Sequence, residues 1–300
     1  RIYSMITPET NTDHLMENTN NFLPELEEAN KKLEEEKIKN EYLSAQINIH
    51  TNSHNIGEKD EVLSILKLFY YNKSNQYDKL IEIFGDEACE GISIIDETGC
   101  VITDINKINK AKGCLKADVI IKMNKTTKIY TASIKSKNGA NPTILNHTPR
   151  SAKIFITGCL NKCIPSIDIL MQEYIDKRTQ KIIGEDIQLN TLECMKDSSI
   201  ISDVTELLSY FVFDGTGKGD SSCKANSILY YEKNNISFIK CCEVEEKMKY
   251  IESIINSCII SLRDKGMPKT ITDNCNPWVF KDCQENDNIK YKGSLHIRLK

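Results

Sequence analysis

Features that would indicate a membrane, secreted or zinc-binding protein are missing from this sequence. No apolar run reaches about 18 residues, the length at which a bilayer-spanning helix is indicated. The first twenty residues are polar and contain no hydrophobic stretch typical of a secretory leader, so we expect a cytoplasmic protein. The 12 cysteines form no pair of CxxC knuckles, and none of the five histidines lies at ligand spacing to them. We therefore expect reduced, mostly buried thiols.

Acidic residues are missing from one long stretch, between Val119 and Ile167. The same stretch carries eight basic residues, which are Lys122, Lys125, Lys128, Lys135, Lys137, Arg150, Lys153 and Lys162. Because the whole chain has a net charge of −4, this sign asymmetry is strong and local. A basic stretch in an acidic protein is typical of a surface that binds phosphates. A solvated basic loop is the plainer alternative.

The overall composition is that of a globular protein with one large domain or two modest ones. The chain has 300 residues, of which 40% are hydrophobic and 27% charged, and no internal repeat is detectable. The glycine-rich loop at residues 214–226 lacks the GxxxxGK[ST] spacing of a nucleotide-binding loop. We interpret it as a flexible loop that faces DNA.

The N-terminal part predicts a helical arm. Residues 1–21 are polar and irregular, and a helix is expected over residues 22–49 with Pro24 in its first turn. Apolar residues recur at heptad spacing, at Leu26, Leu33 and Ile47. This imperfect coiled-coil pattern indicates either a dimerisation arm or a solvated helix, and the sequence does not distinguish them.

A polar break at residues 50–57 predicts the boundary between an arm and helix at 1–54 and one globular domain at 55–300. The next helix is expected to begin after Asn55, with Glu58 completing a capping box. Its buried stripe includes Val62, and both Glu58 and Glu61 fall on or beside that stripe. An acid in this place is either a helix-dipole partner or a functional carboxylate.

Apolar periodicity and turn residues predict the remaining elements. Helices are expected at residues 77–84, 142–160, 164–183, 203–213 and 245–263, and strands at residues 91–96, 100–103, 227–231, 236–241 and 293–300.

Two β-rich runs at residues 117–123 and 128–135 are separated by a short polar break and predict a hairpin. Asp118 lies at the start of the first run, and Lys135 lies at the end of the second. In an antiparallel pair these two positions are close in space. A carboxylate that binds a divalent ion, beside a lysine that orients water, suits the hydrolysis of a phosphodiester bond.

The hairpin resembles the PD-(D/E)xK nuclease core, in which an acid on one strand is followed by [E/D/S]-x-K on the next. The sequence SIKS at residues 133–136, followed by a glycine and by TILN at residues 143–146, resembles type II restriction endonucleases of the HpaII kind. The likeness is local and covers about residues 57–155. Ala117 stands where many members have proline, and Ser133 stands where many have an acid.

The resemblance implies an α/β restriction-endonuclease-like fold, with a mixed central sheet flanked by helices. It implies a metal-binding Asp118, a catalytic Lys135 beside Ser133, and a further carboxylate from Glu61 or Glu58. The implied cofactor is Mg²⁺, for which Mn²⁺ substitutes. The implied activity is site-specific cleavage of double-stranded DNA by a homodimer, whose two-fold symmetry matches a palindromic site.

Donor-rich residues after the hairpin are candidates for contacts with phosphates or base edges. These residues are Lys137, Asn141, Asn146, His147, Arg150 and Lys153, together with Lys218 in the glycine-rich loop and Arg298 in the last strand. Hydrogen bonding within loops and caps is the alternative. A repair or junction-resolving nuclease, or a non-catalytic DNA-binding scaffold protein, remains open beside the restriction enzyme.

Overall fold

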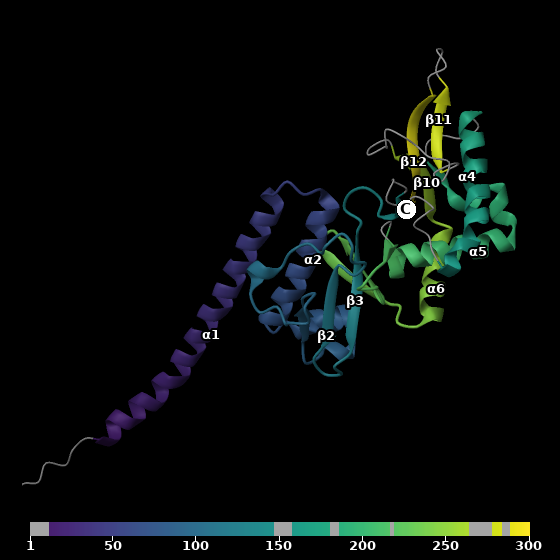
Figure 1. Ribbon diagram of the computed structural model, residues 1–300. Coiled ribbons are helices and arrows are strands. Elements are labelled where there is room, and N and C mark those ends of the chain that lie inside the picture. Colours follow the sequence, from purple (N-terminus) through teal and green to yellow (C-terminus); the bar gives the residue numbers. More distant parts are fainter. Residues whose placement is uncertain (1–11, 147–157, 181–185, 217–218, 264–277, 284–288) are drawn as a thin grey trace, which may run out of the picture.

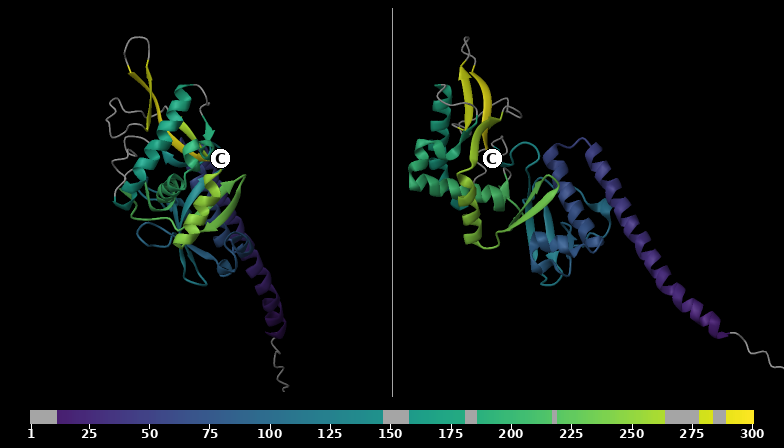
Figure 2. Two further views of the ribbon diagram at one scale, coloured as in Figure 1. Left: turned by 90° about the vertical axis from the view of Figure 1, so that its right-hand side faces the viewer. Right: turned by 180° about the vertical axis from the view of Figure 1, so that it is seen from behind.

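The computed structural model describes residues 12–146, 158–180, 186–216, 219–263, 278–283 and 289–300. They form two lobes that lie side by side, with one long helix projecting from the first lobe (Figures 1 and 2). Among the helices described, none combines the length and the apolarity needed to cross a membrane.

The first lobe is built on a mixed five-stranded sheet with the order β1-β2-β3-β8-β9. Its strands are β1 (Ile92–Ile95), β2 (Val119–Met123), β3 (Ile129–Ser136), β8 (Ser227–Glu232) and β9 (Asn235–Lys240). Strands β3 and β8 are parallel, whereas the other neighbours are antiparallel. The predicted hairpin at residues 117–135 is confirmed, as are the strands expected at residues 227–231 and 236–241 and a mixed sheet flanked by helices.

Helices α2 (Ile56–Lys73) and α3 (Tyr77–Phe84) cover one face of this sheet. The apolar stripe of α2 packs on alternate residues of the strands, such as Ile121 in β2 and Ile134 in β3. The predicted capping box is present, because the Asn55 side chain accepts a hydrogen bond from the Glu58 backbone at 3.0 Å and Glu58 accepts one from the Asn55 backbone. The cap fixes where α2 begins.

Helix α1 (Thr12–Thr51) is longer than predicted. It begins ten residues before residue 22, and Pro24 lies inside it rather than in its first turn. Residues 13–23 contain neither glycine nor proline, so no strong helix breaker separates them from the rest of the helix. The end of α1 docks on α2, where the rings of Tyr42 and Tyr70 stack with centroids 4.3 Å apart.

The second lobe contains a further sheet, with the order β11-β12-β10-β5 and with β4 paired to β12. Its strands are β4 (Thr143–Asn146), β5 (Ile187–Gln188), β10 (Cys258–Arg263), β11 (Val279–Cys283) and β12 (Ile289–Leu299). Its helices are α4 (Ile164–Thr179), α5 (Ser198–Ser209) and α6 (Val244–Ile255). The second sheet and its own hydrophobic core were not predicted.

Short elements complete the fold. These are the 3₁₀ turns η1 (Asp86–Ala88), η2 (Ile105–Lys107), η5 (Gly158–Cys163), η6 (Leu189–Thr191) and η7 (Glu193–Lys196), the π-helical turn η8 (Tyr210–Asp214), and the two-residue strands β6 (Gly215–Thr216) and β7 (Gly219–Asp220). The expected strand at residues 100–103 is reduced to a bridge between Ile95 and Val101.

Three further predicted helices were wrong in extent or type. Residues 143–146 form strand β4 where a helix was expected, because they pair with β12. The helix expected at residues 245–263 ends at Ile255, and its second half is strand β10, which also pairs with β12. Helix α5 begins at Ser198 rather than at Asp203, since the Asp197 side chain caps it by accepting a hydrogen bond from the Ser199 backbone at 2.8 Å.

Strand β8 connects the two hydrophobic cores. Leu229 is buried in the core of the first lobe, and its neighbour Ile228 is buried in the core of the second. Successive side chains of a strand point to opposite faces, so one strand contributes to both cores. The face of the first sheet opposite α2 is thereby turned toward the second lobe.

Candidate functional site

The β2–β3 hairpin brings Asp118 against the end of β3, as predicted. The backbone N–H of Asp118 donates to the Ala132 carbonyl at 2.8 Å, so Asp118 pairs with β3 just before β2 begins. One carboxylate oxygen, Oδ2, accepts hydrogen bonds from the Ile134 backbone N–H at 2.6 Å and from the Ser133 hydroxyl at 3.3 Å. Strand β3 therefore fixes the orientation of this carboxylate.

Lys135 follows Ser133 by two residues, so both side chains lie on the face of β3 opposite α2. Lys135 is near enough to Asp118 to stabilise its negative charge. Burial nevertheless raises the pKa of Asp118, and Lys135, the Ile134 N–H, Lys116 and Ser133 only oppose that shift. A partly buried carboxylate is thus held beside an ammonium group.

Glu61 brings a second carboxylate from α2. Its pKa is raised to about 7, first by burial and then by the negative charge of Asp118, while Lys110 and Lys135 oppose the shift. These mutual effects put Glu61, Asp118 and Lys135 in one electrostatic cluster. The structure thus brings Glu61 of α2 together with Asp118 and Lys135 of the hairpin, three residues that the sequence had singled out.

Glu58, the alternative to Glu61, is engaged elsewhere. It completes the α2 capping box and forms an ion pair with Lys110. The hydrogen bond from Lys110 is the main reason why the pKa of Glu58 is lowered. Glu58 is therefore a cap and ion-pair residue, and Glu61 is the acid that lies with Asp118.

Lys116 belongs to the same cluster and was missed by the sequence analysis. Burial lowers the pKa of Lys116 to about 7, and Lys135 lowers it further, whereas Asp118 and Glu61 oppose the shift. Lys116 precedes Asp118 by two residues, so in an extended chain both side chains share a face. This spacing is the sequence signal that could have identified Lys116 as a neighbour of Asp118.

The second half of the glycine-rich loop packs against the residues that precede Asp118. The Ser221 hydroxyl accepts a hydrogen bond from the Lys116 backbone N–H at 2.8 Å, and the Cys223 carbonyl accepts one from the Ala117 N–H at 3.0 Å. Beside it a groove of about 1060 Å³ reaches Asp118 and is lined by Ser222, Cys223 and residues 107–112. This part of the loop thus helps to hold the start of β2.

The donors expected to contact DNA fall into three groups. Lys137 is exposed, with its Nζ 4.3 Å from the centroid of the Tyr230 ring, and Asn141 is half-buried. Arg298, the candidate in the last strand, is held by an ion pair with Asp186 at 2.9 Å. Asn146 lies on β4 with no described side chain, and His147, Arg150, Lys153 and Lys218 lie outside the described residues.

The described lysines of the basic stretch do not form a single surface. Lys122 lies at the end of β2 and Lys128 just before β3, so both are at the hairpin end remote from Asp118. Lys128 forms an ion pair with Glu87 at 2.8 Å, and Lys162 forms one with Glu206 at 2.9 Å. Folding thus separates and partly neutralises charges that are contiguous in sequence.

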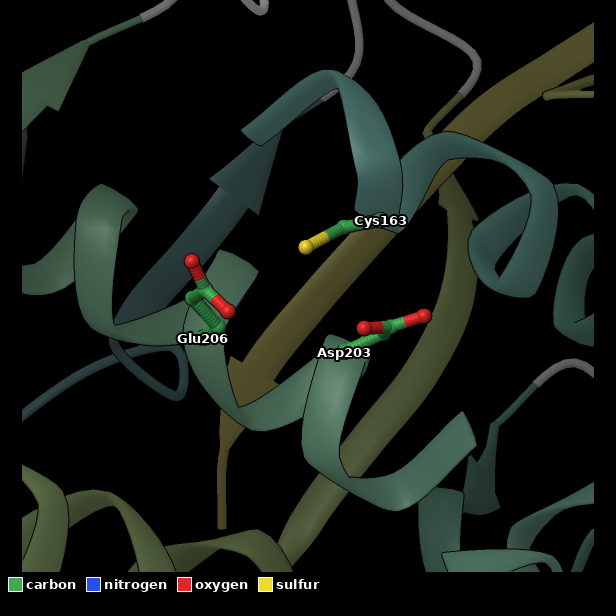
Figure 3. Close-up of side chains that lie close together, drawn as sticks. All are labelled: Cys163, Asp203 and Glu206. Atoms are coloured by element: carbon green, nitrogen blue, oxygen red, sulfur yellow. The ribbon is translucent and has the colours of Figure 1, made fainter. Parts of the chain in front are cut away.

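Among the described residues, one group of three potential ligands has its ligand atoms close enough to hold a metal ion. Cys163, Asp203 and Glu206 lie within 4.8 Å of one another between η5 and α5 (Figure 3). Asp203 accepts a hydrogen bond from the Ser166 hydroxyl at 2.5 Å, and Glu206 is paired with Lys162. A thiol is a poor ligand for Mg²⁺, and both acids have protein partners, so this group does not fit that ion.

Asp118 and Glu61 fit Mg²⁺ better. Both are hard oxygen donors, and the pKa values of both are raised, so the site disfavours two negative charges without a cation. One carboxylate is anchored by β3 and the other comes from α2. Two carboxylates, with phosphate oxygens and water completing the coordination, are a donor set that Mg²⁺ accepts.

Comparison with known proteins adds a structural likeness. No protein-family model matches the chain, and no curated protein matches its sequence. Among solved structures, the chain is similar to the crystal structure of restriction endonuclease MspI in complex with its cognate DNA. The similarity covers 87% of this chain and 97% of that chain, with 11% sequence identity and a TM-score of 0.33. The functional argument therefore rests on the side-chain geometry.

Proposed function

We propose that the chain is a Mg²⁺-dependent endonuclease that hydrolyses phosphodiester bonds of double-stranded DNA at a specific site, as type II restriction endonucleases do. The observation that carries this proposal is the convergence of Glu61, Asp118 and Lys135, with Ser133, at one end of the hairpin. Two carboxylates and an ammonium group at one place are the residue types that metal-assisted phosphodiester hydrolysis needs.

Asp118 and Glu61 are the proposed metal ligands. A bound Mg²⁺, or Mn²⁺ in its place, supplies Lewis-acid polarisation of the phosphate and makes water a better nucleophile. Ser133 and the Ile134 N–H hold Asp118 Oδ2, which leaves Oδ1 as the oxygen for the ion. Glu61 would then supply the second carboxylate, which many members of the nuclease family carry at the position of Ser133.

Lys135 is the proposed catalytic lysine. Its ammonium group stabilises negative charge on the scissile phosphate and orients the attacking water. Lys137, two residues further on and exposed, is proposed to bind a neighbouring phosphate of the same strand. Asn141 and the donors at residues 146–153 remain proposed contacts to DNA, with Lys218.

The proposed assembly is a homodimer on a palindromic site. Helix α1 supports this proposal, because Leu26, Leu33 and Ile47 are each about 60% or more exposed at heptad spacing. An unpaired apolar stripe on a long helix suits a second copy of the same helix.

The test is digestion of plasmid DNA with the wild type, Asp118→Ala, Lys135→Ala and Glu61→Gln, each with Mg²⁺ and with EDTA. Glu58→Gln is the matched control, since it changes an acid one turn away on the same helix. We expect discrete fragments from the wild type and from Glu58→Gln with Mg²⁺ only. The other three variants should lose at least about 100-fold in rate.

Other outcomes discriminate between the alternatives. A smear in place of discrete fragments would favour a repair or junction-resolving nuclease with relaxed sequence preference. Salt-sensitive DNA binding without cleavage in Mg²⁺ or Mn²⁺ would favour a non-catalytic DNA-binding protein. Cleavage that survives Asp118→Ala and Lys135→Ala would refute the assignment of the chemistry to this hairpin.

A further inference from the structure

Asp60, the residue before Glu61, is buried and polar, with an exposed fraction of only 5%. Its Oδ2 accepts a hydrogen bond from the Ser136 hydroxyl and another from the Asn138 side-chain amide at 3.0 Å. Ser136 is in turn the residue after Lys135. Asp60 and Ser136, which are adjacent in sequence to Glu61 and Lys135, are thus hydrogen-bonded to each other.

On β3, the Asp60 partner Ser136 and the site residues Ser133 and Lys135 lie on opposite faces. Ile134 packs under α2, so Ser136 shares that buried face, whereas Ser133 and Lys135 lie on the other. Adjacent side chains on a helix diverge by about 100°. Asp60 therefore points to Ser136 of β3, whereas Glu61 points away from that contact and interacts with Asp118. The Asp60–Ser136 bond therefore fixes the distance between the elements that carry Glu61 and Lys135.

The same network reaches the β8–β9 turn. The Asn138 side-chain oxygen accepts a hydrogen bond from the Lys233 backbone N–H at 2.7 Å. Two turns along α2 from Asp60, the Lys67 ammonium donates to the Asn234 carbonyl. Lys233 and Asn234 have φ values of 46° and 67°, which define a tight hairpin turn. Helix α2 is thus tied to the rest of the sheet at two points.

We propose that Asp60 is a positioning residue that, through Ser136 and Asn138, holds Glu61 at the distance from Asp118 that a divalent ion requires. This inference rests on the proposed function, because it assigns Glu61 to the metal. Shifts of about 1 Å in supporting residues are enough to lower the activity of a site on the order of 100-fold. Asp60 itself touches neither the ion nor the DNA.

The experiment is a calorimetric titration of Mn²⁺ into the full chain, beside cleavage rates with the same metal. Asp60→Ala removes the acceptor, and Ser136→Ala removes a donor. Asp60→Asn is the conservative variant, since its amide oxygen still accepts both hydrogen bonds. Val62→Ala is the matched control, because it removes buried apolar contacts from the same turn of α2 and leaves the polar network intact.

We expect Asp60→Ala to bind Mn²⁺ about 10- to 100-fold more weakly and to cleave correspondingly more slowly. Asp60→Asn should stay within about threefold of the wild type, and Ser136→Ala should lie between the two. Val62→Ala should lose stability in urea but keep its Mn²⁺ affinity. DNA binding in EDTA should be equal in all five proteins.

Three results would overturn the inference. Unchanged Mn²⁺ affinity in Asp60→Ala would show that the network does not position Glu61. Equal losses in Asp60→Asn and Asp60→Ala would show that the charge of Asp60 matters rather than its hydrogen bonds. A wild type that binds no Mn²⁺, or binds it as Glu61→Gln does, would refute the proposed metal site together with the inference. The Glu61→Gln comparison thus separates failure of the function from failure of the positioning role.

Discussion

Two glutamates one turn apart on α2 differ in the direction in which folding shifts their pKa values. The pKa of Glu58 is lowered by its hydrogen bond with Lys110, whereas burial and Asp118 raise that of Glu61 to about 7. Sequence periodicity put both acids beside the buried stripe and did not separate them. The two pKa values differ because Lys110 lies beside Glu58 and Asp118 lies beside Glu61 in the folded chain. A local sequence pattern does not show these contacts.

Glu61 makes the metal-free protein less stable as the pH rises. Its folded-state pKa of about 7 lies above the unfolded value of about 4.5, so the folded form binds more protons between these values. Stability is therefore lost as the pH rises through this window. We expect Glu61→Gln to be more stable than the wild type in urea with EDTA at pH 8, and to differ less from it at pH 5.

Glu58→Gln is the control for this pH dependence. Because the pKa of Glu58 is lowered, its contribution to stability is lost only as the pH falls below about 4.5. The difference between Glu58→Gln and the wild type should thus be the same at pH 5 and pH 8. A Glu61→Gln advantage that does not grow with pH would contradict the assigned environment of Glu61.

Asp118 and Lys135 were predictable because their relation is local. A hairpin with a short turn has a register fixed by its own sequence, and the Asp118 backbone N–H donates to the Ala132 carbonyl of the neighbouring strand. Asp60 and Lys116 were missed, because nothing in the neighbours of Asp60 distinguishes it from an ordinary surface charge and the alternation of Lys116 with Asp118 is a weak signal by itself. Their importance comes from Ser136, Asn138 and Ser221, which lie far from them in sequence or on other elements.

At the scale of elements, the two strands that were predicted as helix share one cause. Residues 258–263 continue the apolar pattern of α6, yet they form β10, because β12 offers them a pairing partner. Ile259 and Ile260 are β-branched, which suits a strand, but a short apolar run does not by itself distinguish the two structures. Strand β4 was taken for helix for the same reason, since its partner is also β12.

The docking of α1 depends on one aromatic contact near its end. Tyr42 stacks on Tyr70 and accepts a hydrogen bond from Gln46 at 2.8 Å. Replacing Tyr42 with alanine should weaken the docking by about 0.5–1.5 kcal/mol beyond the area lost. We expect limited proteolysis to cut Tyr42→Ala faster than the wild type at residues 52–55, between α1 and α2. Gln46→Ala, which keeps the ring stack, should show a smaller effect.

At the scale of the whole molecule, the exposed stripe of α1 is the basis for dimerisation. We expect the chain to sediment as a dimer and the double variant Leu33→Lys/Ile47→Lys to sediment as a monomer. Asn48→Lys adds a charge on the neighbouring position of α1 and should remain dimeric. A monomeric wild type would identify α1 as a solvated helix.

The shared strand β8 should make the two lobes unfold together. Leu229 is fully buried in the first core, whereas Trp278, the one tryptophan of the chain, is fully buried in the second. Leu229→Ala should lower the free energy of unfolding by about 2–5 kcal/mol. We expect the urea midpoint reported by Trp278 fluorescence to fall by the full amount, in step with circular dichroism. An unchanged fluorescence midpoint would mean that the lobes unfold independently.

The parallel pairing of β3 with β8 also bears on the order in which the protein is made. Glu61, Asp118 and Lys135 all precede Ser136, whereas β8 begins only at Ser227, after helices α4 and α5 of the second lobe. On the ribosome, the helix and hairpin that carry the chemistry can form before β8 has been translated. Such non-local pairing is slow, so β8 is expected to join this sheet after the hairpin and to complete a site whose reactive groups are already assembled.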